Sequence, residues 1–330
     1  MKNNFQSKED ALIHKLAKSF FGGHHNFDLD PFEIEAFTWT VQEKLLNLTI
    51  KNGLIMKYPI SYEFCRLYLK NILRYIESTQ EVHEEIYEFL CSIMSKKQGT
   101  NDFCYRHYIL ENNYNNIVTL KETKNMVING TTGMKTWEAA LLLTDWMLSN
   151  KDIFKNKTIL ELGSGVGFTG ITLTKLCDVS ITLTDCHDDV LKTINENIQI
   201  NFPDSHQNHT DDLTVYEINN KTLRVMMLDW NNIDEVKIGE NPDVLIGADI
   251  VYDPCILEPL CKVLQAFFVK NRSLNAYIAC VIRNENTFNK FLQALDVYKM
   301  VAEKLTMTGC VHLDWDLHIN KCIVKIKYVG

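Results

Sequence analysis

Three aspartates of this chain stand directly after short stretches of strand-like sequence. They are Asp185, Asp229 and Asp249. In an open α/β sheet, ligands bind beyond the carboxyl ends of the central strands, so we expect these carboxylates to meet at one ligand site. There Asp185 could accept hydrogen bonds from ribose hydroxyls, and Asp229 could accept them from the polar edge of an adenine ring. The pattern therefore predicts a nucleotide-like ligand.

A glycine-rich turn at residues 163–167 follows the apolar stretch 158–162. Gly163 and Gly165 allow a tight turn, because glycine tolerates positive φ and places no side chain between the backbone amides and a ligand. Asp185 lies 22 residues after Gly163, close to the roughly 20 residues typical of an acid that holds a ribose. Dinucleotide-binding folds use a similar turn, so the turn alone does not separate hydride transfer from methyl transfer.

The residues after the stretch 244–248 form a D-x-x-Y pattern. Ala248 is small and leaves room for a ligand, and Asp249 and Tyr252 would project towards that ligand from the end of the strand. At the same edge, Trp230 could pack on an adenine ring. These residues give the predicted ligand site an aromatic wall and a carboxylate beside its reactive part.

Strands and helices alternate along the second part of the chain, which predicts a doubly wound parallel sheet. The predicted strands are residues 158–162, 179–184, 223–228, 244–248 and 277–282. At 323–328, apolar residues alternate with lysines, as in an antiparallel edge strand that is wet on one face. The predicted fold class is α/β, a Rossmann-like sheet with an antiparallel C-terminal hairpin.

The first part of the chain has a helical pattern instead. Ser61 is placed to cap a helix in this part, and Thr136 is placed to cap a helix in the second part. The segments predicted here are helices at 61–73 and 79–94 and a polar connection at 95–116. In the second part we also predict short strands at 117–120 and 126–128, and a surface loop in the polar insert 204–212. We therefore predict two domains, a small helical N-terminal domain at 1–115 and the α/β domain at 116–330.

The composition is that of an ordinary globular protein. The chain has 330 residues, of which 46% are hydrophobic and 23% charged, enough for a full core. Its formal net charge of −8 argues against a nucleic-acid-binding surface. No apolar run approaches the roughly 20 residues of a membrane span, and residues 1–10 lack the apolar core of a signal peptide. We expect a cytoplasmic monomer that binds neither nucleic acid nor membrane.

The ten cysteines are scattered and form no C-x-x-C pair. Cys65, Cys177 and Cys280 sit inside apolar runs, as small core residues do in a reducing compartment. Their spacings match no zinc site, so no metal is expected from them.

Together these patterns resemble a known enzyme family. The motifs are E-L-G-S-G-x-G at 161–167, the strand-ending Asp185, the pair Asp229-Trp230 and D-x-x-Y at 249–252. They are similar to those of the seven-stranded S-adenosyl-L-methionine-dependent methyltransferases, and within these to the protein-lysine methyltransferases. The stretches 130–141, 184–187 and 281–284 narrow the resemblance to the enzymes that methylate a lysine of eukaryotic elongation factor 2.

The resemblance implies a seven-stranded methyltransferase sheet, S-adenosyl-L-methionine as cofactor and elongation factor 2 as protein substrate, methylated to trimethyl-lysine. Asp249 and Tyr252 would face the methyl group and the incoming lysine. The residues implied to line the cofactor site are Trp137, Gly163, Ser164, Gly165, Asp185, Trp230 and Ala248. No metal is required, because the methyl donor already carries a positive charge.

Methyl transfer to lysine requires a neutral amine, whereas a free lysine has a pKa of about 10.4. A dry channel would lower this pKa, and a nearby carboxylate would raise it. We therefore expect Asp249 to position the amine, with the proton released to water.

Two alternatives remain open, the same chemistry on another protein and a catalytically inactive S-adenosyl-L-methionine-binding interaction protein. A nicotinamide-dependent oxidoreductase is disfavoured, because the sequence offers no catalytic acid for a carbonyl in a familiar arrangement.

Overall fold

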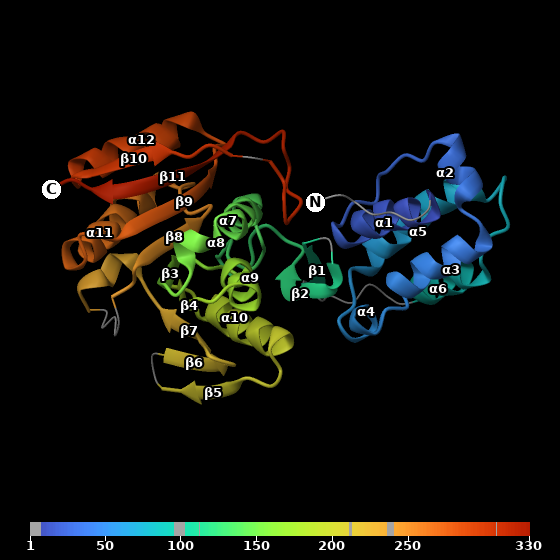
Figure 1. Ribbon diagram of the computed structural model, residues 1–330, viewed down its shortest axis with the longest axis horizontal. Helices are drawn as coiled ribbons and strands as arrows, with labels where there is room; N and C mark the ends of the chain where they lie inside the picture. The colour runs from blue at the N-terminus through green and yellow to red at the C-terminus, as the bar shows by residue number, and fades with distance from the viewer. Residues whose placement is uncertain (1–7, 96–102, 112, 211–212, 236–240, 308) are drawn as a thin grey trace. The chain divides into compact units, whose positions relative to one another are not determined.

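The structure is a computed structural model that describes residues 8–95, 103–111, 113–210, 213–235, 241–307 and 309–330. The chain divides into two compact units (Figure 1), one formed by Met1–Ile109 with Lys121–Lys124 and the other by Leu110–Leu120 with Asn125–Gly330. The predicted division into independent domains at residues 115 and 116 stays a prediction. The predictions for residues 1–7, for 96–102 and 112 in the polar connection, and for 211–212 in the insert lie outside the described residues.

The first unit is helical. Its helices are α1 (Lys8–Phe21), α2 (Pro31–Ala36), α3 (Trp39–Leu48), α4 (Gly53–Lys57), α5 (Tyr62–Ile76) and α6 (Glu84–Ser95). Phe20 and Tyr68 are fully buried with ring centroids 5.1 Å apart, and the Tyr68 hydroxyl donates to the carbonyl oxygen of Leu16 at 2.8 Å. The helix predicted at 61–73 is confirmed as α5, with Ser61 at its N-cap position but without a side-chain capping bond.

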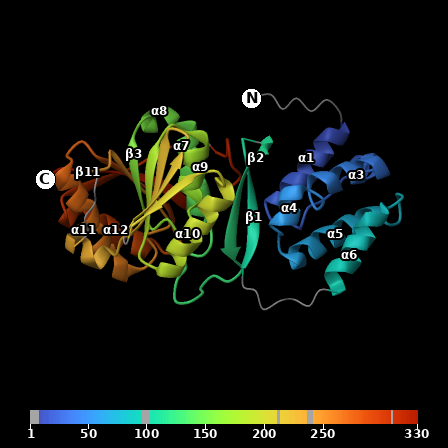
Figure 2. The same ribbon diagram turned by 90° about the horizontal axis from the view of Figure 1, so that it is seen from below.

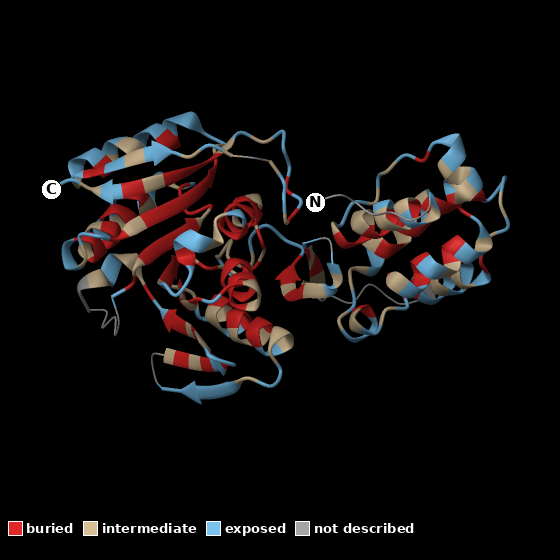
Figure 3. Ribbon diagram, viewed as in Figure 1, coloured by how far each residue is buried: buried red, intermediate tan, exposed pale blue. Residues whose placement is uncertain are grey.

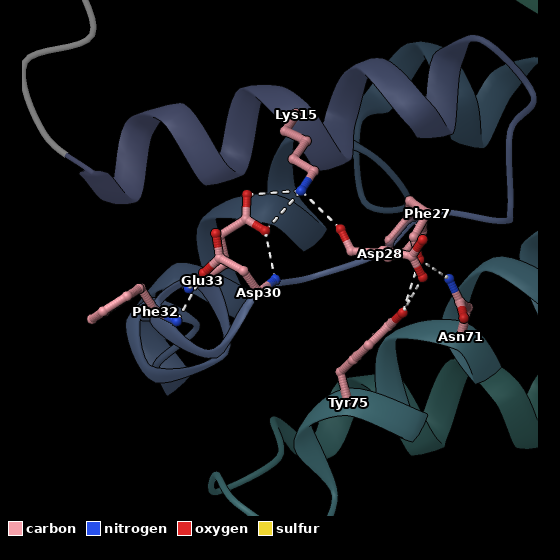
Figure 4. Close-up of polar contacts among 8 residues, drawn as sticks. All are labelled: Lys15, Phe27, Asp28, Asp30, Phe32, Glu33, Asn71 and Tyr75. Atoms are coloured by element: carbon pink, nitrogen blue, oxygen red, sulfur yellow. Dashed lines mark hydrogen bonds and ion pairs between the residues drawn. The ribbon is translucent and has the colours of Figure 1, made fainter.

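A cluster of polar groups ties the segment between α1 and α2 to its neighbours (Figure 4). Lys15 on α1 donates to both carboxylate oxygens of Glu33, at 2.8 and 2.7 Å, and to the carbonyl oxygen of Asp28 at 2.8 Å. The Tyr75 hydroxyl on α5 donates to the Asp28 carboxylate at 2.8 Å. We call this group, drawn in Figure 4, the Lys15 cluster; its members are Lys15, Phe27, Asp28, Asp30, Phe32, Glu33, Asn71 and Tyr75.

Two strands, β1 (Phe103–Leu110) and β2 (Asn113–Thr123), form a separate two-stranded sheet. They correct the prediction of a polar connection at 95–116. The asparagines there favoured a loop, but the aromatic and β-branched residues of 103–110 favour a strand. The short strand predicted at 117–120 lies inside β2, whereas the one predicted at 126–128 is wrong: only an isolated bridge between Ile128 and Thr131 is formed.

The main sheet contains nine strands among the described residues, in the order β10-β11-β9-β8-β3-β4-β7-β6-β5. Their bounds are β3 (Thr158–Leu162), β4 (Ser180–Asp185), β5 (His206–His209), β6 (Leu213–Ile218), β7 (Lys221–Met227), β8 (Val244–Ala248), β9 (Asn275–Val281), β10 (Met300–Lys304) and β11 (Lys321–Tyr328). Strands β7, β4, β3, β8 and β9 are parallel, and β11 and β10 are antiparallel. The predicted fold class, with its antiparallel C-terminal end, is confirmed.

Two details of this prediction need correction. The seven predicted strands correspond to β7 through β10 along the sheet, but β6 and β5 extend it on the other side of β7 by antiparallel pairing. The insert at 204–212 was predicted as a loop, but it contains strand β5. All four residues of β5 are exposed, so the strand forms through pairing with β6 and not through an apolar face. Strand β11 is not an edge strand, because β10 covers its outer side.

Helices cover both faces of the main sheet. Helices α7 (Glu138–Ser149), α9 (Phe168–Leu176) and α10 (Asp188–Asn201) lie on one face, and α11 (Pro254–Lys270) and α12 (Glu285–Val297) on the other (Figure 2). The short helix α8 (Lys151–Phe154) follows α7. The central strands are almost entirely buried between these layers (Figure 3). Thr136 does not cap α7 as predicted; the N-cap is Trp137, which has an extended backbone and makes no side-chain capping bond.

Cys65, Cys177 and Cys280 are buried, as predicted, and all ten cysteines are free thiols. Within the described ranges, no helix has the length and apolarity needed to cross a bilayer. Within the same ranges, no group of three or more His, Cys, Asp or Glu side chains could hold a metal ion.

Candidate active site

The turn between β3 and α9 reaches the end of the sheet with very little side-chain bulk. Gly163 and Gly165 have φ angles of +63° and +53°, in the left-handed region that favours glycine. A Cβ atom on Gly163 would lie 2.9 Å from Cγ2 of Ile250, and one on Gly165 would lie 3.0 Å from the carbonyl oxygen of Gly133. Both positions therefore require glycine for backbone conformation and for space.

Ser164, between these glycines, fastens β3 to β4. Its amide donates to the carbonyl oxygen of Thr184 at 2.8 Å, and its hydroxyl oxygen accepts from the amide of Thr184 at 3.0 Å. The same hydroxyl donates to the carbonyl oxygen of Glu161 at 3.4 Å. The side chain thus helps to hold the glycine turn in register with the end of β4.

Asp185 is the last residue of β4, as predicted. One carboxylate oxygen accepts from the amide of Gly165 at 3.3 Å, and the other accepts from the amides of Cys186 at 2.9 Å and His187 at 3.3 Å. Burial raises the pKa of Asp185, and the hydrogen bonds from these three amides oppose that rise. The carboxylate is therefore held in one orientation beside the glycine turn.

Asp229 and Trp230 follow β7 at the same edge. The Asp229 carboxylate accepts from the amide of Asn231 at 2.9 Å and from the side chain of Asn232 at 3.0 Å. The indole of Trp230 approaches the glycine turn, with Cζ2 3.6 Å from the position that a Cβ on Gly163 would take. The predicted aromatic wall thus lies against the turn.

Asp249 follows β8 and has an unusual backbone. Its φ of +57° lies in the left-handed region, where a residue other than glycine costs free energy and often marks a functional site. Its amide donates to the carbonyl oxygen of Ala279 at 2.9 Å, which secures the turn to β9. The carboxylate receives a fork of two hydrogen bonds from Arg283, Nη1 to Oδ1 at 3.0 Å and Nη2 to Oδ2 at 2.7 Å.

Two aromatic residues, Trp137 and Tyr252, line a cavity together with Asp249. The Trp137 indole nitrogen donates to the carbonyl oxygen of Thr132 at 3.0 Å, and the Arg283 guanidinium carbon lies 5.3 Å from the Trp137 ring centroid. Tyr252 is 51% exposed, so its ring is accessible to an incoming group.

These elements surround one cavity of about 460 Å³, a size typical of small-molecule sites. The structure brings all nine predicted site residues to its wall; they are Trp137, Gly163, Ser164, Gly165, Asp185, Trp230, Ala248, Asp249 and Tyr252. The wall comes from the carboxyl ends of β3, β4, β7 and β8 together with the segments before α7 and at the start of α11.

Sequence reasoning missed Glu161, which also lines the cavity. It is 2% exposed, and burial raises its pKa to about 7. Its Oε2 atom has no hydrogen-bond partner among the described residues. The signal was present, because an acid inside an apolar strand must find a partner or lose its charge.

Arg283 was noted only as part of the stretch 281–284. Its pairing with Asp249 joins positions 34 residues apart, on the connections that follow two neighbouring strands. Such pairing depends on strand order, which a single sequence does not specify.

A Rossmann-like sheet with an antiparallel end, a glycine turn and strand-ending acids around one cavity define the class of S-adenosyl-L-methionine-dependent methyltransferases. The model of the lysine methyltransferase family matches residues 115–297 of the chain.

Two relatives share most of its length. Protein-lysine N-methyltransferase EEF2KMT of Bos taurus is 31% identical over 318 residues, which are 89% of this chain and 92% of that one. The Homo sapiens protein of the same name is 32% identical over 257 residues, 76% of this chain and 75% of that one. Protein-lysine N-methyltransferase EFM3 of Saccharomyces cerevisiae is 27% identical over 53% of this chain and 52% of its own length.

The chain therefore belongs to the lysine methyltransferase family. Its reaction is S-adenosyl-L-methionine-dependent N-methylation of lysine, and its substrate is a protein.

Proposed function

We propose that this chain methylates a lysine of elongation factor 2, up to trimethyl-lysine, with methyl groups from S-adenosyl-L-methionine. The observation that carries the proposal is the assembly of the predicted residues around one cavity, with Asp249 and an exposed Tyr252 in its wall. The substrate is supported by the resemblance of stretches 130–141, 184–187 and 281–284, and by relatives whose name, EEF2KMT, combines elongation factor 2 with lysine methyltransferase.

The cavity suits the cofactor in size and in chemistry. The Asp185 carboxylate, fixed by backbone amides, would accept hydrogen bonds from the ribose hydroxyls. Trp230 would pack on the adenine ring, and Asp229 would accept from its polar edge. Gly163, Gly165 and Ala248 would let the backbone approach the cofactor closely, because larger side chains there would fill the space.

Glu161 would receive the positively charged amino group of the cofactor's methionine part. Glu161 lines the cavity and its Oε2 atom is buried without a partner among the described residues, and burial disfavours an isolated charge. A cation at this place would supply the missing partner and would lower the pKa of Glu161 from about 7. The acid is therefore costly for the empty protein and favourable for the loaded one.

Asp249 and Tyr252 would receive the substrate lysine. The Asp249 carboxylate keeps free lone pairs beyond the two that Arg283 uses, so it can accept a hydrogen bond from the amine and aim the nitrogen. Tyr252 would orient the amine or its methyl groups through its hydroxyl or ring face. Such positioning can contribute several kcal/mol to lowering the barrier, on the order of 7–11 at best.

When bound, the cofactor supplies a methyl group on a positively charged sulfur; the lysine nitrogen bonds to that carbon as the carbon–sulfur bond breaks, and the electron pair stays on sulfur. Before this step the lysine ammonium releases a proton to water. Each further methylation repeats the sequence with a methylated amine.

The remaining features of the proposal concern the protein's setting. We propose that it acts in the cytoplasm as a monomer, without binding nucleic acid, and that elongation factor 2 is its protein partner. The net charge of −8 supports a surface that repels nucleic acid and suits a lysine-bearing partner. We also propose that residues 1–115 and 116–330 are separate domains, of which the second carries the reaction.

The test is transfer of radiolabelled methyl groups from S-adenosyl-L-methionine to purified elongation factor 2. Asp249→Asn is the variant of choice, because asparagine tolerates the left-handed backbone that alanine would strain. We expect one labelled protein with the wild type and a loss of rate of about 100-fold with the variant, because the amine is no longer aimed. Glu285→Gln, at an exposed acid outside the cavity wall, is the matched control and should keep full activity.

Label on a different protein would contradict elongation factor 2 as substrate while leaving the chemistry in place. Cofactor binding without transfer to any protein in a whole-cell extract would favour an inactive binding protein. Full activity of Asp249→Asn would overturn the role of Asp249.

A further inference from the structure

Arg283 is held at a fixed place behind the reactive end of the cavity. Its backbone amide donates to the carbonyl oxygen of Val281 at 3.1 Å, and the backbone amide of Ile282 donates to the carbonyl oxygen of Asn320 at 2.8 Å. Asn284 then caps helix α12 with its side chain. The short connection from β9 to α12 is therefore anchored at both ends, and the arginine side chain starts from a defined backbone position.

From there the guanidinium makes two contacts. Both of its terminal nitrogens bind the Asp249 carboxylate, at 3.0 and 2.7 Å, and its carbon lies 5.3 Å from the Trp137 ring centroid. The Asp249 side chain is only 6% exposed, whereas that of Arg283 is 47% exposed. The aspartate is thus shielded from water on the side where the arginine holds it, in the bidentate geometry that only arginine offers.

This pairing changes what Asp249 does to a nearby amine. A carboxylate with uncompensated charge stabilises a lysine ammonium and raises its pKa, which opposes methyl transfer. The ion pair of a carboxylate with a guanidinium has no net charge, and its carboxylate keeps lone pairs for hydrogen bonding. The ion pair can therefore aim an amine without stabilising its protonated form.

Resting on the proposed function of Asp249, we infer that Arg283 is a positioning residue that aims Asp249 and balances its charge, so that the substrate lysine is received as a neutral amine. Arg283 is not part of the cavity wall and acts through Asp249. Asp249 must position the amine, but its negative charge alone would keep that amine protonated. The ion pair with Arg283 resolves this conflict.

Other ionisable groups face the same space from the surrounding elements. The acids and the cation are Glu161, Asp185, Asp229 and Lys135. The tyrosine and thiols are Tyr252, Cys186, Cys255 and, behind Asp249 on β9, Cys280. All of them are present unchanged in a variant of Arg283, so a difference in pH dependence between wild type and variant reports on the ion pair.

The first measurement compares kcat and KM for elongation factor 2 in the wild type and in Arg283→Gln across the alkaline pH range. We expect kcat near pH 7.5 to fall about 10- to 100-fold, because a rise of one to two units in the amine pKa lowers the neutral fraction tenfold per unit. Activity should recover towards the wild-type value as the pH approaches about 10, while KM stays equal or falls.

Two control variants separate charge from shape. Arg283→Lys keeps the charge and loses the fork, so it should keep the wild-type pH profile with a lower kcat at every pH. Arg272→Gln removes another arginine that lies over an aromatic ring, 4.5 Å from the centroid of Tyr328, and should change neither kcat nor the profile.

The second measurement needs no protein substrate. Binding of n-butylamine, a lysine side-chain mimic, is followed by NMR in the presence of S-adenosylhomocysteine at several pH values. The wild type should bind the amine more tightly as the pH rises, and Arg283→Gln should bind it at neutral pH about tenfold more tightly than the wild type, because the unpaired carboxylate prefers the ammonium.

A uniform loss of kcat at all pH values in Arg283→Gln, or the same pH dependence of amine binding in both proteins, would overturn the inference. Neither result affects the proposed function, which would fail instead if the wild type transferred no methyl group to elongation factor 2. An alkaline recovery confined to Arg283→Gln supports the inference.

Discussion

The Lys15 cluster and the cavity both contain several acidic side chains, but they differ in whether those acids have hydrogen-bond partners within the protein. In the Lys15 cluster the Glu33 carboxylate binds Lys15 through both oxygens, and the Asp30 carboxylate caps α2 by accepting from two amides. In the cavity Glu161 keeps an unpartnered oxygen, and Asp249 has a left-handed backbone. The Lys15 cluster pairs these acids with its own donors, whereas the cavity contains a buried acid with an oxygen that a bound ligand could satisfy.

Among the changes that test this difference, we expect the largest effect at the glycine turn. Gly165→Ala would place a Cβ 3.0 Å from the carbonyl oxygen of Gly133, at a φ of +53°. We expect cofactor affinity to fall by about 100-fold or more, because the turn must shift where the backbone faces the ligand. Titration calorimetry with S-adenosylhomocysteine measures it. Gly53→Ala, where a Cβ meets nothing within 4 Å, is the control in the helical unit, and an equal loss there would contradict the argument.

Asp185 is expected to have the next largest effect. Asp185→Asn removes the charge that would accept from the ribose hydroxyls, and we expect a loss of affinity of about 10- to 100-fold, as for a hydrogen bond to a charged group. Equilibrium binding of S-adenosyl-L-methionine measures the loss. Asp28→Asn, in the Lys15 cluster, should leave binding unchanged; wild-type affinity in Asp185→Asn would show that this acid does not contact the cofactor.

Glu161 makes a prediction about stability. Its pKa is raised from 4.5 to about 7 in the folded protein, so the unfolded chain binds fewer protons between these values. Stability of the protein without cofactor should therefore fall as the pH rises from about 4.5 to about 7 and then level off, by on the order of 3 kcal/mol at most. Glu161→Gln should remove this decline and stabilise the protein above pH 7.

Urea unfolding at several pH values tests this prediction. Glu33→Gln is the matched change in the Lys15 cluster, where the acid has a partner, and it should cost a little stability at neutral pH instead of adding to it. A decline between pH 4.5 and 7 of the same size in Glu161→Gln as in the wild type would mean that Glu161 does not carry the effect.

The smallest effect is expected in the Lys15 cluster itself. Lys15 is 41% exposed and Glu33 24% exposed, so their pairing is screened by water. Lys15→Met should lower the free energy of unfolding by about 1 kcal/mol or less and should leave cofactor binding unchanged. Thermal unfolding and calorimetry measure the two quantities, and a clear loss of cofactor affinity would contradict the view that this cluster is purely structural.

The sequence predicted the parts of the site that depend on local pattern. Strand-ending acids such as Asp185 and Asp249, and the turn at 163–167, follow from the alternation of apolar strands with turn residues, and the order of strands in an α/β sheet brings them to one edge. The predicted strand 244–248 matches β8 residue for residue.

The parts that were missed depend on tertiary pairing. The sequence H-Q-N-H of β5 favours a loop, because it has no buried apolar face. The strand forms only because β6 offers it a partner for backbone pairing. The ion pair of Asp249 with Arg283 depends on β9 lying next to β8. The unpartnered oxygen of Glu161 is visible only once its neighbours are known.

The most direct test of this account is calorimetric titration of S-adenosyl-L-methionine near pH 7 in buffers with different ionisation enthalpies. A cation placed beside Glu161, whose pKa is about 7 in the empty protein, should ionise it and release about half a proton per molecule bound. Glu161→Gln should bind more weakly and release no proton from this group. Saturable binding with proton release in the wild type alone would support the account; absence of binding, or equal release in both proteins, would contradict it.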